Sequence, residues 1–486
     1  MSRPVHGRVL LVFPPAHFRL GSGHLPDAGT ELPYTFPPLG LLYLAAVLRR
    51  ADWAAEVVDF GGEPYSVGRL LAAARDADVV GLSVVRDNRH QVRRVIEDLH
   101  RGGSRAPIIV GGPDVTLRPV LFDHCVATVC GEAEQIIVEL VERLLRGDGI
   151  CGLPGVLSRD PRDGQPRQAS PPVLPADLDA IPLPDRSLCD RMRYSMFDER
   201  NRGRTALVIT SRGCPFDCSF CSRVALTQHG YRVRSPDNVL DELALLHRDG
   251  YRFLFFGDNN FMLDRGRVCS IMDGIVARGL NDLRIVVAGR ADAADAEIYR
   301  RMRRAGVFLI SLGLESGNQD SLAFLNKRTS VERNRQAVRL ADRAGLFVHG
   351  NFIIGSGNET LQHVERTRRF ALELPLDSIF VNILAYQYGS PLWQRAHQEG
   401  RIADGELNKL STADNGLGQL SEAELRRELK RMLRTFFLRG SYWARQAVKA
   451  VRLREPYFLV LVGKLCARYF LTEMRRAWRP GPRGAA

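Results

Sequence analysis

The sequence predicts an α/β protein in which two successive sets of alternating strands and helices are followed by a helical region. Short runs rich in β-branched and aromatic residues alternate with helical patterns over residues 8–146, and the alternation resumes after residue 199. A proline-rich stretch separates the two series. The length of 486 residues also exceeds what one ordinary hydrophobic core accommodates, so several domains are expected.

The first series, within residues 1–150, predicts an open, doubly wound (Rossmann-like) parallel sheet. Its strand-like runs are Arg8–Phe13, Ala55–Phe60, Asp78–Val85, Pro107–Gly111 and Val126–Cys130. Helical stretches lie between them, at about 39–51, 66–76, 89–102 and 132–146. Because strands separated by helices form βαβ units, the sheet should be parallel, with a ligand at the carboxyl ends of its strands.

Residues 151–198 are rich in proline and predict a linker. The second series, over residues 199–400, offers six further strands, which are too few for a closed eight-stranded barrel. We therefore expect a partial (β/α)6 barrel with its site at the carboxyl ends of the strands. These strands are Ala206–Ser211, Arg252–Gly257, Leu283–Ala288, Val307–Gly313, Phe347–Ile354 and Ser378–Ala385. Residues 401–486 predict a helical C-terminal domain, with helices at Ser421–Leu438 and Tyr442–Met474.

Composition narrows the class of protein. Apolar residues make up 45% and charged residues 25%, which is ordinary for a globular protein. No apolar run is long enough for a membrane span, and the N-terminus lacks a signal peptide, so a cytoplasmic location is expected. The net charge of +13 comes from arginines spread along the chain, which favours a composition bias over a nucleic-acid site.

The nine cysteines are scattered apart from one cluster, which does not fit a disulfide framework. Six of them stand alone and are interpreted as small core residues: Cys125, Cys130, Cys151, Cys189, Cys269 and Cys466.

The cysteine cluster follows the first strand of the second series, in the segment Arg212-Gly-Cys-Pro-Phe-Asp-Cys-Ser-Phe-Cys221. Three thiolates from Cys214, Cys218 and Cys221 fit one loop and suit three irons of a four-iron, four-sulfur (4Fe-4S) cubane. The fourth iron would stay open for a substrate, as in catalytic metal sites. The alternative is a zinc site with His229 as fourth ligand, against which the position after a barrel strand argues.

This motif, with the aromatic Phe220 before its last cysteine, resembles the signature of the radical SAM superfamily. The resemblance implies that S-adenosylmethionine (SAM) chelates the open iron through its amino and carboxylate groups. An electron from the cluster, delivered by a donor such as flavodoxin or ferredoxin, then gives a 5′-deoxyadenosyl radical.

Further segments resemble the SAM-binding segments of that superfamily. Phe256–Asn259 matches the contact to the methionine amino group, and Arg290 a basic residue near the SAM carboxylate. Glu315, within Ser311–Asn318, matches a residue that meets the ribose hydroxyls, and Asn351 begins the adenine-binding segment. The expected SAM residues are Phe220, Gly257, Asp258, Asn259, Arg290, Glu315, Ser316 and Asn351. The loop Gly355–Glu359 lacks the proline that family members often carry.

The first domain resembles the cobalamin-binding domain fused to many radical SAM enzymes. Val110–Thr116, Val129–Glu134 and the junction Asp177–Asp185 carry this resemblance. The expected cobalamin residues are Ser83, Gly111, Gly112, Pro113, Gly131 and Glu132. The Asp-x-His-x-x-Gly motif that supplies an axial histidine is absent, although His17 lies in the corresponding loop, so we expect cobalt without a protein histidine. The alternative is a packing domain without a cofactor.

The resemblance implies a cobalamin-dependent radical SAM methyltransferase of the class B methylase type, acting on an unactivated carbon of a small molecule, as in natural-product biosynthesis. One alternative within the family is a rearrangement, cyclisation or oxidation without methyl transfer. Two others are a tRNA-modifying radical SAM enzyme and a non-catalytic cobalamin sensor. The three cluster cysteines argue against the sensor, and the lack of a cysteine triad before residue 151 argues against the tRNA enzyme. The apolar and basic C-terminus predicts either a peripheral membrane contact or a helical cover over the barrel mouth.

Overall fold

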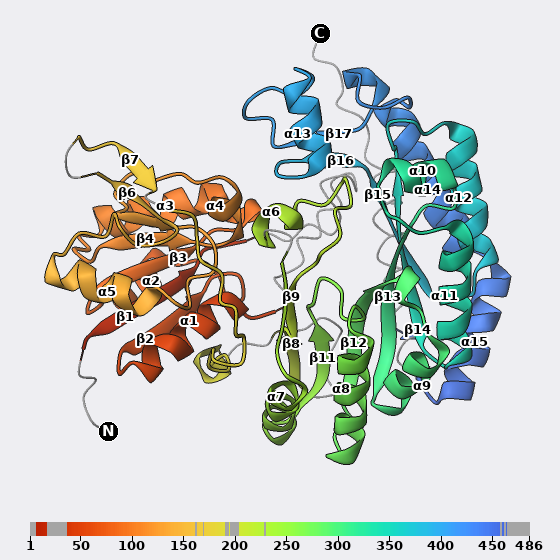
Figure 1. Ribbon diagram of the computed structural model, residues 1–486, viewed down its shortest axis with the longest axis horizontal. Helices are drawn as coiled ribbons and strands as arrows, with labels where there is room; N and C mark the ends of the chain where they lie inside the picture. The colour runs from red at the N-terminus through yellow and green to blue at the C-terminus, as the bar shows by residue number, and fades with distance from the viewer. Residues whose placement is uncertain are drawn as a thin grey trace, which may run out of the picture.

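Seven strands form the N-terminal sheet of the computed structural model, in the order β2-β1-β3-β4-β5-β6-β7 (Figure 1). The model describes residues 6–16, 36–160, 163–168, 170–189, 194, 204–227, 230–456, 459–460 and 463. The five parallel strands are β1 (Arg8–Phe13), β2 (Ala54–Asp59), β3 (Val79–Ser83), β4 (Ile108–Gly111) and β5 (Ala127–Val129). The helices are α1 (Leu39–Arg50), α2 (Val67–Ala74), α3 (Arg89–Arg101), α4 (Pro113–Leu117) and α5 (Ile137–Arg146).

These helices cover both faces of the N-terminal sheet. Leu11 of β1 belongs to an apolar cluster with α1 and α5, and its neighbour Leu10 belongs to a second cluster with α2 and α3. Burial on both faces explains why the parallel strands are nearly continuous apolar runs. The predicted doubly wound sheet is confirmed.

The proline-rich segment contributes to this sheet as well. Its strand β6 (Val156–Arg159) pairs antiparallel with β5, and β7 (Pro166–Gln168) pairs antiparallel with β6 at the edge of the sheet. The sequence predicted only a linker here. Pro166 opens the outermost strand, where a missing backbone N–H costs no ladder hydrogen bond, so the proline signal concealed an edge strand.

Six parallel strands form the second sheet, in the order β15-β14-β13-β12-β11-β8. They are β8 (Arg204–Val208), β11 (Tyr251–Phe256), β12 (Arg284–Arg290), β13 (Val307–Glu315), β14 (Phe347–Ile354) and β15 (Ser378–Ile383). The sheet curls into an open half-barrel with helices outside it (Figure 1), which confirms the predicted partial barrel. Those helices are α7 (Pro236–Arg248), α8 (Arg265–Ala277), α9 (Ala296–Arg304), α10 (Gln319–Phe324), α11 (Val331–Arg343) and α12 (Leu361–Glu373).

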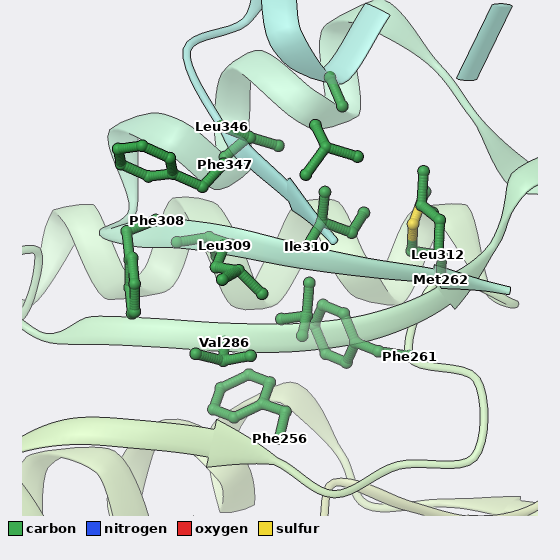
Figure 2. Packing of buried hydrophobic residues seen from close by; sticks show 14 of the residues in the cluster. Phe256, Phe261, Met262, Val286, Phe308, Leu309, Ile310, Leu312, Leu346 and Phe347 are labelled. Carbon is green, nitrogen blue, oxygen red and sulfur yellow. The ribbon is translucent and has the colours of Figure 1, made fainter. Parts of the chain in front are cut away.

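Alternate residues of the barrel strands fill the layer between sheet and helices. Phe256, Ile310 and Leu312 are fully buried there (Figure 2). A short antiparallel pair, β9 (Ser211–Gly213) and β10 (Tyr231–Val233), follows β8 and flanks α6 (Arg223–Thr227). The cysteine loop lies between β9 and α6.

The C-terminal part is not purely helical. Strand β17 (Asn408–Leu410) pairs antiparallel with β16 (Ala385–Gln387) around α13 (Pro391–Gln398). The predicted helical C-terminal region is confirmed, but the sequence did not reveal β17, whose three residues carry too little apolar periodicity to be recognised. The helices α14 (Glu422–Phe437) and α15 (Gly440–Leu453) follow.

Helix α15 packs at the amino-terminal edge of the barrel sheet. Lys449 Nζ donates hydrogen bonds to the Asp377 carboxylate (2.7 Å), the Asp342 carboxylate (2.7 Å) and the Leu346 carbonyl (2.8 Å). Asp377 and Leu346 immediately precede β15 and β14, so α15 lies opposite the cysteine loop. A cover over the barrel mouth is therefore wrong for α15. No described helix is long and apolar enough to cross a membrane.

Candidate active site

The cysteine loop projects from the carboxyl end of the barrel sheet. Cys218 is buried, whereas Cys214 and Cys221 are half-buried, and all three thiols are free. The backbone N–H of Cys221 donates to the Cys218 carbonyl at 3.0 Å, which tightens the loop around its last two cysteines. The loop thus presents three thiols on one short segment, as the sequence predicted.

The surroundings of these thiols suit a negatively charged iron–sulfur cluster. Arg290 Nη1 lies 3.4 Å from Cys218 Sγ. Burial raises the pKa of the Cys218 thiol, and the charges of Lys327 and Arg290 oppose that rise. Among the described residues, no three His, Cys, Asp or Glu side chains are grouped as ligands of one metal ion. A cubane distributes its thiolates over different irons, so it does not require such a group. His229 of the zinc alternative lies outside the described residues.

Two of the expected SAM residues face the cluster loop through buried charges. The Arg290 guanidinium pairs with Asp292 at 2.8 Å and lies 3.8 Å from the centre of the Phe216 ring. Glu315 pairs with Lys327, its Oε1 2.6 Å from Nζ, and has a φ of 60° at the end of β13. Lys327 was not predicted from the sequence, because no motif distinguishes it from a surface lysine.

Asp258 is oriented away from a ligand role. Its carboxylate accepts hydrogen bonds from the Thr210 N–H (2.7 Å), the Thr210 hydroxyl (2.5 Å) and the Ser211 hydroxyl (2.6 Å). Burial raises the pKa of Asp258, and these hydrogen bonds act against the rise. Asp258 therefore joins the segment after β11 to the segment after β8. Its neighbour Asn259 accepts from Arg223 Nη1 at 2.5 Å.

The remaining expected SAM residues divide between the site and the scaffold. The Ser316 hydroxyl lies 2.9 Å from the Thr367 hydroxyl on α12, on the helix side of the sheet. Asn351 Nδ2 donates to Ser311 Oγ (2.9 Å) and the Leu312 carbonyl (3.3 Å), and the Asn351 side chain also hydrogen-bonds His349. Phe220 packs beside Lys327, whose Nζ is 6.0 Å from the ring centre.

A cavity of about 540 Å³ lies between the N-terminal sheet and the barrel. All six residues expected to bind cobalamin line it: Ser83, Gly111, Gly112, Pro113, Gly131 and Glu132. Barrel residues complete its wall, and they include Ser211, Arg212, Gly213, Arg223, Gly257 and Asn259. The cavity follows the carboxyl ends of β3, β4 and β5, where open parallel sheets bind ligands. Its volume is typical of cofactor sites.

Gly112 shapes this cavity through its backbone. Its φ is 117°, and a Cβ there would lie 2.6 Å from the Val84 carbonyl oxygen. At Gly111 the nearest atom to such a Cβ would be the Val129 carbonyl oxygen at 3.5 Å, an ordinary contact. The chain between β4 and α4 can follow this path only with glycine at position 112.

We expect Gly112→Ala to weaken cobalamin retention at least about tenfold, because strain of about 1–3 kcal/mol would move the β4–α4 turn into the cavity. Cobalamin absorbance after gel filtration measures the retained cofactor. Gly68→Ala supplies the control: Gly68 lies in α2, where a Cβ would meet only Ser66 Oγ at 3.8 Å, so this variant should retain wild-type cobalamin. Equal retention by both variants would contradict this role for Gly112.

A half-buried charge cluster joins the two domains beside the cavity. Arg212 of β9 donates to Glu132 (2.5 Å) and Glu134 (2.7 Å), and Arg232 of β10 also binds Glu132. Burial alone would raise the pKa of Glu132, but the hydrogen bonds and charges of Arg232 and Arg212 hold it below its usual value. Glu132 therefore lines the cavity with its carboxylate committed to the barrel. We call Arg212, Arg232, Glu132 and Glu134 the domain clamp.

Comparison with known proteins identifies the class to which this fold and site belong. Residues 208–371 match the family model of the radical SAM superfamily, and residues 27–141 match that of the B12-binding domain. The chain is a radical SAM enzyme with a cobalamin-binding domain, and its cofactors are a 4Fe-4S cluster, SAM and cobalamin. Both domains that define cobalamin-dependent radical SAM enzymes are thus matched in this one chain.

Several curated proteins resemble most of this chain. An uncharacterised methyltransferase of Pyrococcus horikoshii is 29% identical over 89% of this chain and 93% of its own length. An anaerobic magnesium-protoporphyrin IX monomethyl ester cyclase of Cereibacter sphaeroides is 27% identical over 82% of this chain and 65% of its own length. The hopanoid C-2 methylase of Rhodopseudomonas palustris is 24% identical over 84% of this chain and 73% of its own length.

Two solved structures share the fold. The radical SAM methyltransferase TsrM from Kitasatospora setae has a TM-score of 0.67 and 20% identity, covering 82% of this chain and 77% of its own. The cobalamin-dependent radical SAM enzyme OxsB has a TM-score of 0.65 and 17% identity, covering 85% of this chain and 64% of its own. At these identities the likeness establishes the two-domain fold.

Proposed function

We propose that this protein is a cobalamin-dependent methyltransferase that methylates an unactivated carbon of a small molecule. The shared cavity carries the proposal, since the expected cobalamin residues and the residues flanking the cluster loop line one space. The relatives named as a methyltransferase and as a hopanoid methylase support it. When bound, the cluster and SAM supply a 5′-deoxyadenosyl radical, and cobalamin supplies a methyl group that a carbon radical can take.

The residues of the chain have separate roles in this proposal. Cys214, Cys218 and Cys221 would hold the cluster. Arg290 would bind the SAM carboxylate, and Glu315 would accept hydrogen bonds from the ribose hydroxyls. Gly111 and Gly112 would let the backbone approach cobalamin closely, and Ser83 would hydrogen-bond its nucleotide tail. An electron carrier such as flavodoxin or ferredoxin is the proposed reductant.

The concave face of the half-barrel offers room for the substrate. Strand pairing places Ala288, Ser311, His349 and Ser378 in one row across β12 to β15. Their neighbours Val287, Ile310 and Val348 are fully buried under the helices, so this row faces the concave side. All four side chains are only half-buried, and three are small. A barrel normally fills such layers with bulky apolar residues, so this row favours a ligand space.

His349 would present an uncharged polar group to that space. Its Nδ1 lies 2.6 Å from Ser378 Oγ, and burial lowers the pKa of His349 to about 4. The imidazole is therefore neutral near pH 7, and no charged side chain belongs to the row. We infer that the part of the substrate next to the reacting carbon is uncharged.

A second candidate is a cyclisation or oxidation without methyl transfer. The cyclase relatives, at 27% identity over 82% of this chain, favour it. A tRNA-modifying enzyme has less support. Cys125 and Cys130 are buried in the N-terminal core, and the Cys130 thiol lies 3.4 Å from the Val115 carbonyl oxygen. Such thiols serve packing rather than a second cluster, and we propose no nucleic-acid partner.

Product analysis tests methyl transfer against its alternative. Each methylation should consume one SAM for the radical and a second to remethylate the cofactor. We therefore expect 5′-deoxyadenosine and S-adenosylhomocysteine in nearly equal amounts when reconstituted enzyme turns over with trideuteromethyl-SAM and a small-molecule extract. A product heavier by the trideuteromethyl group should accompany them in mass spectra. Deoxyadenosine formed with an extract component, without matching S-adenosylhomocysteine, would favour the cyclase-type reaction.

A further inference from the structure

A buried lysine outside every recognised motif lies at the proposed SAM site. Lys327 is 6% exposed, as is its partner Glu315, and the two charges are 2.6 Å apart. A lysine is seldom buried unless it is paired, so the contact with Glu315 accounts for the burial of Lys327. We propose that Lys327 is a SAM-positioning residue that fixes the Glu315 carboxylate for the ribose hydroxyls. This inference rests on the proposed function.

Gly313 of β13 leaves space for the Glu315–Lys327 ion pair. A Cβ on Gly313 would lie 2.6 Å from Glu315 Oε1 and 2.8 Å from Lys327 Nζ. Strand pairing sets Gly313 between Arg290 of β12 and Asn351 of β14, both expected SAM residues. The Glu315–Lys327 pair therefore lies beside β12, β13 and β14, the strands that would hold the adenosine part of SAM. Glycine at 313 thus leaves room for the two charged groups, which a larger residue would displace.

The backbone around Lys327 also supports the cluster loop. The Ser219 N–H donates to the Leu325 carbonyl (3.0 Å), and the Ser219 hydroxyl donates to the Phe324 carbonyl (2.9 Å). Asn326 Nδ2 donates to the Asp217 carbonyl at 3.0 Å. Ser219 and Asp217 lie beside Cys218. The turn after α10 therefore supports the middle of the cluster loop through these three hydrogen bonds.

The same turn reaches the proposed SAM carboxylate site. Arg290, which contacts Cys218, also donates a hydrogen bond to the Lys327 carbonyl oxygen. Asn326 and Arg328 flank Lys327 with φ values of 47° and 52°, a left-handed conformation that non-glycine residues rarely adopt. Such strain persists where the surroundings fix the chain, and it is concentrated at functional sites. One turn thus aligns the cluster loop, Arg290 and Glu315.

The test measures SAM binding by equilibrium dialysis on anaerobically reconstituted holoenzyme. Lys327→Met should weaken SAM binding at least about tenfold, because a charge-assisted hydrogen bond to Glu315 is lost. Lys327→Arg should stay within about threefold of the wild type, because it restores a cation to the same partner. Lys409→Met is the control, since Lys409 pairs with Glu406 near the surface and should leave binding unchanged. All variants should keep the wild-type iron content.

A double-mutant cycle separates action through Glu315 from an independent effect. Glu315→Gln should weaken SAM binding, and adding Lys327→Met should weaken it little further. The electron paramagnetic resonance spectrum of the reduced cluster should change with SAM in the wild type and in Lys327→Arg, and less in Lys327→Met. Wild-type SAM affinity in Lys327→Met, or fully additive losses in the double variant, would overturn the inference. A wild-type protein that binds no SAM would instead overturn the proposed function.

Discussion

Replacing Cys214, Cys218 and Cys221 together by alanine should remove all cluster iron, against about four irons per chain in the reconstituted wild type. The three thiols lie on one loop, and Cys218 faces Arg290. Without thiolates no other described group of side chains there is arranged to hold metal. Visible absorbance of the cluster and formation of 5′-deoxyadenosine should both be abolished. Iron analysis and absorbance spectroscopy measure the effect.

The control for this variant is Cys269→Ala, which removes a half-buried thiol from α8, remote from the cluster loop in the sequence. It should keep its iron. Cobalamin retention should survive in the triple variant, because the cavity is lined mainly by the N-terminal domain. Tight stoichiometric zinc in the wild type, with no uptake of iron, would contradict the cluster assignment.

Lys449→Met should lower the free energy of unfolding by about 3 kcal/mol, because it removes the nearer of two cations from the fully buried Asp377 carboxylate and leaves only Arg445 at 3.7 Å. Lys449 joins α15 to the barrel at three points, which are two carboxylates and the carbonyl preceding β14. The midpoint of urea unfolding, followed by circular dichroism, should fall accordingly.

Arg452→Met is the matched control, since Arg452 is an exposed residue of the same helix. Its unfolding midpoint should stay close to the wild-type value, as is usual for surface substitutions. If Lys449→Met were as stable as Arg452→Met, α15 would not be anchored through Asp377.

The buried parallel strands were predictable because burial on both faces leaves a clear apolar run. Phe347–Ile354 was predicted with the bounds that β14 has in the structure. The strands β6, β7, β16 and β17 were missed, because each is short and, unlike the equally short β4 and β5, lies outside the regular alternation of strands and helices. Their pairing depends on neighbours that a local pattern does not reveal. Short edge strands therefore need tertiary information.

The residues of the candidate site also divide into those that the sequence predicted and those that it did not. Residues within motifs, such as Cys214 and Gly112, were predicted from local spacing. Lys327 and Arg212 were missed because their partners are 12 and 80 residues away in the sequence. Asp258 lies within a motif, yet its carboxylate binds Thr210 and Ser211. His17 belongs to the loop in which other cobalamin domains carry the axial histidine, and it lies outside the described residues. The absence of a protein histidine at cobalt therefore stays a prediction.

The domain clamp restricts the route by which a substrate can reach the space between the two domains. Arg212 stands two residues before Cys214, and its guanidinium is fixed to Glu132 and Glu134 of the other domain. A hinge motion that separated the two domains at the domain clamp would displace the cluster loop and break the ion pairs of Arg212. We therefore expect the interface between the two domains to keep its geometry during turnover. We expect substrate and product to pass instead through the open side of the half-barrel, because β8 and β15 are the outermost strands of its described sheet and do not pair with each other.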